Sequence, residues 1–88
     1  MKLKYKMIVN EVAGKKVAVA VGDDIDKFSG FIKTNDVGAE IIKILENNVT
    51  IDEIVAILKS EYPHEDEAEI ENIVKMFVEA FEKEQILE

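Results

Sequence analysis

The spacing of apolar residues changes near Asn35, and this change constrains the fold more than any other feature of the chain. Before it, apolar residues such as Tyr5, Met7 and Val9 recur at every second position, which is the period of a β-strand. After it, the period becomes that of an amphipathic helix, with a stripe that passes through Ile41. Strands followed by helices, in segregated order, predict an α+β fold.

Turn and capping residues set the expected boundaries. Ala13-Gly14-Lys15 predicts a hairpin turn, Thr50 and Glu53 match the capping box that starts a helix, and Pro63 ends that helix. Asp66 offers another cap, with Glu69 as its partner. The expected elements are strands at about 4–11, 15–21 and 30–34 and helices at about 36–47, 51–62 and 66–85, which form one domain over residues 1–88. The buried face of the second helix is expected to comprise Ile54, Val55, Ile57, Leu58 and Tyr62.

Length and composition exclude several classes of protein. With 88 residues the chain has no room for a two-domain enzyme, and without cysteine it cannot build a disulfide, a thiolate zinc site or an iron–sulfur cluster. Its longest purely aliphatic run, residues 17–21, is far below the roughly 20 residues of a membrane span. The first residues show no signal-peptide pattern. We therefore expect a cytoplasmic protein with no membrane partner and no cofactor.

Acidic residues are concentrated in the second part of the chain. The net charge is −8, from 11 lysines and 19 acidic residues with no arginine. Residues 1–35 carry seven lysines against four acidic residues, whereas residues 36–88 carry four lysines against fifteen. Proteins that bind nucleic acid normally present a basic surface. We therefore predict no nucleic-acid partner.

No catalytic or metal-binding constellation emerges from the motifs. Residues 14–16 lack the upstream glycine and the helix of a phosphate loop. The three aspartates of residues 23–26 fail both registers of a calcium loop, because Phe28 or Ser29 stands where glycine is needed. His64 has no partner at ligand spacing, and the acidic residues after it belong to a polar helix start. We expect a non-enzymatic protein without a metal site.

An interaction surface is the remaining interpretation. A strand that ends the sheet at Thr34 leaves backbone groups unpaired, which is a template for an added strand. The third helix carries more apolar residues than one stripe buries, since Met76 and Ala80 lie on the flank next to Ile73. Core packing accounts for Phe77, whereas for Met76 and Ala80 core and surface roles are both open.

Three passages carry a resemblance to a known family. Phe31 to Ile42, the cap Thr50-Ile51-Asp52-Glu53, and Leu58 to Tyr62 resemble the pyrroloquinoline quinone biosynthesis protein D family, and the likeness spans Lys4 to Leu87 in element order. Members of that family bind the leader of ribosomally made, later modified peptides. The resemblance implies a winged helix-turn-helix-like domain, with three antiparallel strands followed by three helices, that does no chemistry.

The resemblance also implies a site and partners. In that family the leader of the precursor peptide lies between the third strand and the third helix, where it extends the sheet by one strand. The complex is then presented to a maturation enzyme, such as a radical SAM enzyme or a peptidase/cyclase. The positions carried over to this sequence are the backbone of Phe31, Ile32, Lys33 and Thr34 for pairing, an apolar wall of Ile73, Met76, Phe77 and Ala80, and Phe28 at one end.

Two departures from the family and two alternatives accompany this interpretation. Asn47-Asn48 stands where relatives often have Asp-Gly and can still adopt a left-handed cap, and Glu84-Gln85 stands where they commonly have glycine. One alternative is a winged-helix DNA-binding regulator, but residues 50–61 hold one lysine against three acidic residues. The other is a module whose edge strand pairs with a second copy. We expect a monomer or a weak dimer.

Overall fold

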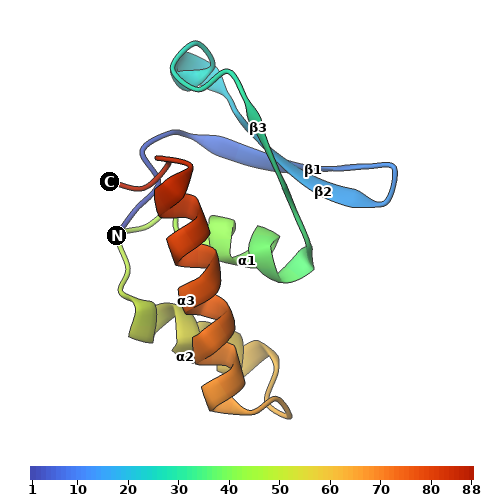
Figure 1. Ribbon diagram of the computed structural model, residues 1–88, viewed down its shortest axis with the longest axis vertical. Helices are drawn as coiled ribbons and strands as arrows, with labels where there is room; N and C mark the ends of the chain where they lie inside the picture. Colours follow the sequence, from blue (N-terminus) through green and yellow to red (C-terminus); the bar gives the residue numbers. More distant parts are fainter.

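The computed structural model describes residues 1–88, and a small sheet precedes three helices (Figure 1). The strands are β1 (Met7–Val12), β2 (Lys15–Ala20) and β3 (Phe31–Thr34), and the helices are α1 (Asp36–Ile44), α2 (Ile51–Glu61) and α3 (Glu67–Lys83). A short 3-10 turn, η1 (Gly22–Asp24), interrupts the connection from β2 to β3. The strands are antiparallel in the order β1-β2-β3. The predicted α+β fold is confirmed.

The β1–β2 hairpin closes through a two-residue turn. Val12 pairs with Lys15, and the two residues between them, Ala13 and Gly14, have φ angles of 52° and 78°. Positive φ at both positions matches the right-handed twist of the flanking strands. Glycine adopts this conformation at no steric cost, so the predicted turn forms where the sequence offers it.

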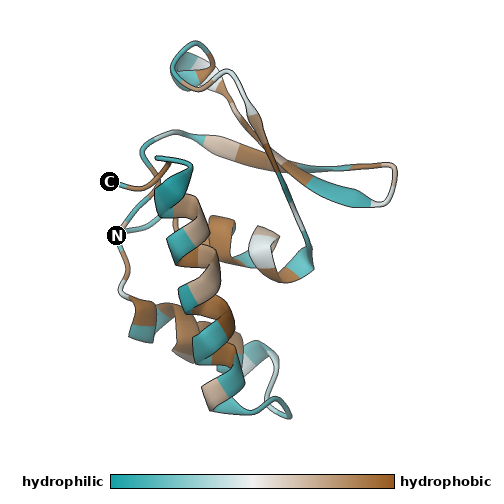
Figure 2. Ribbon diagram, in the orientation of Figure 1, coloured by the Kyte–Doolittle hydropathy of each residue, from teal (hydrophilic) through white to brown (hydrophobic).

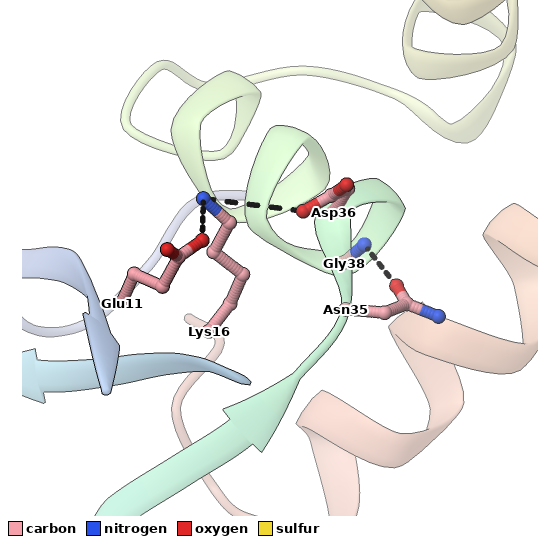
Figure 3. A network of polar contacts seen from close by, with 5 residues as sticks. All are labelled: Glu11, Lys16, Asn35, Asp36 and Gly38. Atoms are coloured by element: carbon pink, nitrogen blue, oxygen red, sulfur yellow. Dashed lines mark hydrogen bonds and ion pairs between the residues drawn. The ribbon is translucent and has the colours of Figure 1, made fainter. Parts of the chain in front are cut away.

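Side-chain caps start all three helices. Asn35 accepts a 2.9 Å hydrogen bond from the Gly38 N–H at the start of α1 (Figure 3). The predicted capping box of α2 is confirmed, because Thr50 and Glu53 each accept the other's N–H, at 3.1 and 3.0 Å. Asp66 caps α3 by accepting from the Ala68 N–H, and not through the expected exchange with Glu69.

The core lies where the helices pack on one another and on one face of the sheet. Apolar stretches of α1 and α2 lie beside α3 there (Figure 2), and α3 contributes the buried Ile70, Val74, Val78 and Phe81. The most deeply buried large side chains are Ile41, Ile42, Leu45, Ile54, Leu58, Val74 and Ile86. Ile57 and Tyr62 were expected in the core and are exposed, because α2 buries only the stripe of Ile54, Val55 and Leu58. No helix combines the length and the apolar character needed to cross a membrane.

The two ends of the chain lie side by side and complete the core (Figure 1). Leu3 and Leu87 form an isolated antiparallel bridge, and the Lys4 N–H donates to the Ile86 carbonyl at 2.7 Å. Leu3, Ile86 and Leu87 are all buried. The sequence patterns missed this arrangement: the first strand was expected from about residue 4 whereas β1 begins at Met7, and no element was predicted after residue 85.

Helix ends also differ from the expected boundaries. α1 ends at Ile44 and not near residue 47, and neither Asn47 nor Asn48 takes the left-handed conformation. α3 ends at Lys83, and Gln85 adopts a φ of 60°. A residue in the left-handed region just past a helix stops the helix and redirects the chain. Gln85 therefore turns Ile86 back into the core.

Candidate functional site

β3 is an edge strand, because it pairs only with β2. Neighbouring side chains of a strand point to opposite faces, and accordingly Ile32 is buried and Thr34 half-buried, whereas Phe31 and Lys33 are exposed. In an antiparallel ladder about half of the backbone N–H and C=O groups of an edge strand have no partner within the sheet. These groups can pair with an added strand.

One flank of α3 presents apolar side chains that the core does not bury. The helix is buried through Ile70, Val74, Val78 and Phe81. Helical spacing places the four predicted wall residues, Ile73, Met76, Phe77 and Ala80, together on one side of that stripe. Phe77 is half-buried, whereas Ile73 is 38% exposed, Met76 is 60% exposed and Ala80 is exposed. Met76 and Ala80 are therefore surface residues. Below, the α3 flank denotes Ile73, Met76, Phe77 and Ala80.

Gly38 of α1 is where β3 and the α3 flank meet. A side-chain carbon added at Gly38 would lie 1.7 Å from the Thr34 Oγ1 atom and 2.8 Å from the Phe77 Cε1 atom. Thr34 and Phe77 therefore approach the backbone of α1 through the space that a side chain would fill. The Thr34 hydroxyl is buried there without a hydrogen-bond partner. Sequence reasoning missed Gly38, because a glycine needed for close approach looks like any other helical glycine.

Two ion pairs that share Lys16 connect the sheet to the start of α1. The Lys16 ammonium on β2 lies 3.3 Å from a carboxylate oxygen of Glu11 and 3.9 Å from one of Asp36 (Figure 3). Lys16 is partly shielded from solvent, whereas the two carboxylates are largely exposed. These ion pairs link β1, β2 and the start of α1, so electrostatic attraction also connects the sheet to α1.

Phe28 contacts the segment that precedes β1. Its ring stacks on the ring of Tyr5, with centroids 5.6 Å apart and planes 21° from parallel. Tyr5 precedes β1, so this stack fastens the loop before β3 to the start of the sheet. A role for Phe28 at one end of the peptide site stays a prediction.

The loop between β2 and β3 is fastened by Asp24. Its carboxylate accepts a 2.7 Å hydrogen bond from the Lys6 N–H and lies 3.3 Å from the Lys27 ammonium. The hydrogen bond from the Lys6 backbone, helped by Lys27, holds the pKa of Asp24 below its usual value. Asp24 therefore has a structural role. His64 and the acidic residues that follow it are exposed, as the sequence predicted for His64.

Two hollows lie beside α1, and Tyr62 contributes to the lining of both. The larger, about 610 Å³, opens between β1 and α1 and mixes apolar and charged side chains. The smaller, about 290 Å³, adjoins the α3 flank, because Ile73 is part of its lining. The helical stretches around it also contribute Val37, Leu58, Tyr62, Glu65, Glu69 and Ile70. Sequence reasoning assigned none of these six to a site.

Comparison with models of known protein families identifies the family of the chain. The model of the family described as coenzyme PQQ synthesis protein D (PqqD) matches residues 15–87. The chain belongs to the PqqD family. The predicted family is thereby confirmed, and the match runs from β2 to the buried Leu87 at the end of the PqqD domain. Among curated proteins, no match to the chain was found.

A solved structure shares the fold of this PqqD-family chain. It is described as TbiB1 in complex with the TbiA(beta) leader peptide, and it superposes with a TM-score of 0.73 at 22% sequence identity. The superposition covers 100% of this chain and 95% of TbiB1. The fold that the chain shares with TbiB1 therefore extends over the whole chain.

Proposed function

We propose that the protein is a non-catalytic recognition protein, which binds the leader of a ribosomally made precursor peptide and presents it to a separate maturation enzyme. The proposal rests on one observation: β3 has a free strand edge, and α3 presents an exposed apolar flank. Membership of the PqqD family and the shared fold with TbiB1, which was solved with a leader peptide, support it.

The physical basis is strand addition with apolar anchoring. The unpaired backbone groups of residues 31–34 supply hydrogen bonds that do not depend on the sequence of the peptide. Alternate side chains of the added strand face the α3 flank, where Ile73 and Met76 offer apolar area and Phe77 forms the floor. Methionine is flexible and polarisable, so Met76 adapts to the shape of the guest.

Chemistry on the bound peptide belongs to the partner. The chain has no cysteine, so an iron–sulfur cluster for radical chemistry has to be held by the maturation enzyme. A radical SAM enzyme or a peptidase/cyclase fits this division of labour, because the recognition protein then supplies only binding and placement.

Calorimetric titration with the synthetic leaders of the precursor peptides encoded beside this gene tests the proposal. We expect at least one leader to bind with a Kd below about 100 μM, equivalent to roughly −5.5 kcal/mol. Met76→Glu should weaken binding at least about tenfold, because it places a charge in an apolar contact. Absence of binding by every neighbouring leader would overturn the proposal.

A matched variant controls for the added charge. Val12 at the end of β1 is 58% exposed, close to the 60% of Met76, and β1 is the strand at the opposite edge of the sheet. Val12→Glu should leave the affinity within about twofold, and both variants should keep the native far-UV circular dichroism because both side chains are exposed. If Met76→Glu unfolds the domain, the assignment of Met76 to the binding surface is wrong.

Self-association is the competing use of the same edge. Sedimentation velocity at rising protein concentration, with and without a bound leader, separates the two uses. Dimers that the leader dissociates indicate that copies and peptide compete for β3, whereas a leader that binds the dimer without dissociating it places the peptide elsewhere.

A further inference from the structure

We infer that the peptide recognised by this protein carries an apolar or aromatic side chain next to a lysine or arginine, on the amino-terminal side of the segment that pairs with β3. The inference rests on the proposed function and adds the chemistry of the guest. Its receptor is the hollow of about 290 Å³ between the helices, called here the acidic pocket and lined by Val37, Leu58, Tyr62, Glu65, Glu69, Ile70 and Ile73.

The acidic pocket continues the path of a strand added to β3. Thr34, the last residue of β3, meets Phe77 at Gly38. Val37, immediately before Gly38, lines the pocket, and so does Ile73, one helical turn before Phe77. A peptide that leaves the edge of β3 past Thr34 therefore arrives at the pocket mouth.

The topology of the sheet fixes which end of the peptide arrives there. Both strand pairs of the sheet are antiparallel, and antiparallel pairing is slightly more stable per residue than parallel pairing. A strand added antiparallel to β3 starts opposite Thr34 and ends opposite Phe31. The residues that precede the paired segment are therefore those that reach the pocket.

The size and lining of the pocket suit one large apolar side chain. Five of its seven lining residues are apolar, and they come from α1, α2 and its C-cap, and α3. Pockets that hold whole small molecules start at about 300 Å³. The volume of this pocket is at that lower limit, so it suits a single side chain. Ile73 and Tyr62 are partly exposed at 38% each, so they offer apolar area that the core does not use.

Negative charge at the pocket mouth favours a basic residue next to the apolar residue of the peptide. Glu65 and Glu69 belong to the lining, and neither carboxylate takes part in an ion pair. The nearby Lys59 ammonium is occupied by the backbone carbonyls of Pro63 and Glu65. The residues between Glu65 and Glu69 include two further acidic residues, so four carboxylates outnumber the single Lys59 ammonium and a cationic guest meets net negative charge.

Selection from a displayed library of random 12-residue peptides, at low salt, tests the inference. We expect selected peptides to enrich a Phe, Tyr, Leu or Ile next to Lys or Arg, toward the amino-terminal side. The double variant Glu65→Lys/Glu69→Lys should weaken the selected peptides about five- to tenfold, as expected for two exposed attractions turned into repulsions. Selection on this variant should shift the enriched neighbour from Lys or Arg to Asp or Glu.

The control is Glu71→Lys/Glu82→Lys, which makes the same change in net charge on the side of α3 opposite the α3 flank. It should change affinity less than about twofold, with native circular dichroism for both double variants. Selected peptides that Met76→Glu weakens but that lack the basic and apolar pair, or ignore the charge reversal at Glu65 and Glu69, overturn the inference and leave the proposed function standing. A library that yields no binder contradicts both.

Discussion

At the scale of single residues, an absent side chain determines how β3, α1 and α3 come together. Gly38 leaves room for the Thr34 hydroxyl and the Phe77 ring, both of which would clash with a side-chain carbon. The buried Thr34 hydroxyl has no hydrogen-bond partner, so close packing is achieved there at the expense of a polar group. The packing of Phe77 in the proposed site thus depends on Gly38, a residue without a side chain.

Gly38→Ala should lower the free energy of unfolding. Overpacking of this kind costs about 1–3 kcal/mol, and the better helix propensity of alanine returns up to about 1 kcal/mol. Urea denaturation measures the difference. Thr34→Ala in the same chain removes the nearest clashing atom and should recover part of the loss. A Gly38→Ala protein as stable as the wild type would show that Thr34 and Phe77 move aside freely.

Asp24 should titrate below the usual value of a carboxyl group. The Lys6 N–H favours the charged carboxylate, so the pKa in the folded protein lies below the reference value of 3.8. The contribution of this contact to folding is present above the unfolded pKa of 3.8 and is lost as the pH falls through the lower folded pKa. An NMR titration should show Asp24 and the Lys6 amide changing together, below pH 3.8. A midpoint at or above 3.8 contradicts the contact.

At the scale of elements, α2 is the helix whose start is most strongly specified. Thr50 and Glu53 satisfy each other's backbone N–H groups, and α2 supplies the buried Ile54, Val55 and Leu58. The capping residues are exposed, so the box fixes where the helix begins without adding to the core. Element boundaries marked by such local contacts can be predicted from the sequence.

Thr50→Ala should destabilise the protein by about 1 kcal/mol, because it removes one side of the capping box. For a domain of this size such a loss corresponds to a fall in Tm of about 4–8 °C. Ser60→Ala is the matched control, since Ser60 is an exposed hydroxyl residue inside the same helix. Peptide affinity should be unchanged in both variants. An equal Tm for Thr50→Ala and the wild type would mean that the box forms no net stabilising contact.

The β3 edge and the α3 flank could be predicted in outline, whereas their junction could not. Alternation of apolar residues identifies residues 31–34 as a strand, and helical spacing places Met76 and Ala80 outside the buried stripe of α3. Both patterns are local in the sequence. Gly38 and the acidic pocket depend on how α1, α2 and α3 pack, which spacing along one element does not report. Ile57 shows the same limit, since its position suits a buried stripe but no partner element covers it.

At the scale of the whole molecule, the paired termini complete the hydrophobic core. Ile86 is fully buried, Leu87 and Leu3 are bridged, and the Leu3 N–H donates to the Leu45 carbonyl at 3.0 Å. Gln85, in the left-handed conformation, turns the chain to make this possible. The bridge joins residues more than 80 positions apart and the Leu3–Leu45 hydrogen bond joins residues more than 40 apart, so no periodicity in the sequence predicts them.

Ile86→Ala should therefore be one of the most damaging single substitutions. Truncation of a fully buried isoleucine costs about 2–5 kcal/mol. Small domains have about 5–15 kcal/mol in total, so thermal unfolding monitored by circular dichroism should begin at a much lower temperature. Ile25→Ala, at a site 59% exposed, should have little effect. Equal losses for the two variants would mean that the C-terminal segment lies outside the core.

The central claim is that a peptide adds to the sheet at β3, and amide hydrogen exchange of the complex tests it most directly. The measurement compares the free protein with the protein saturated by the tightest-binding leader or selected peptide. About half of the amides in residues 31–34, those that point away from β2, should become protected, while the amides of β1 stay unchanged. Protection that appears on β1, or a peptide that binds without slowing exchange in β3, would contradict the claim.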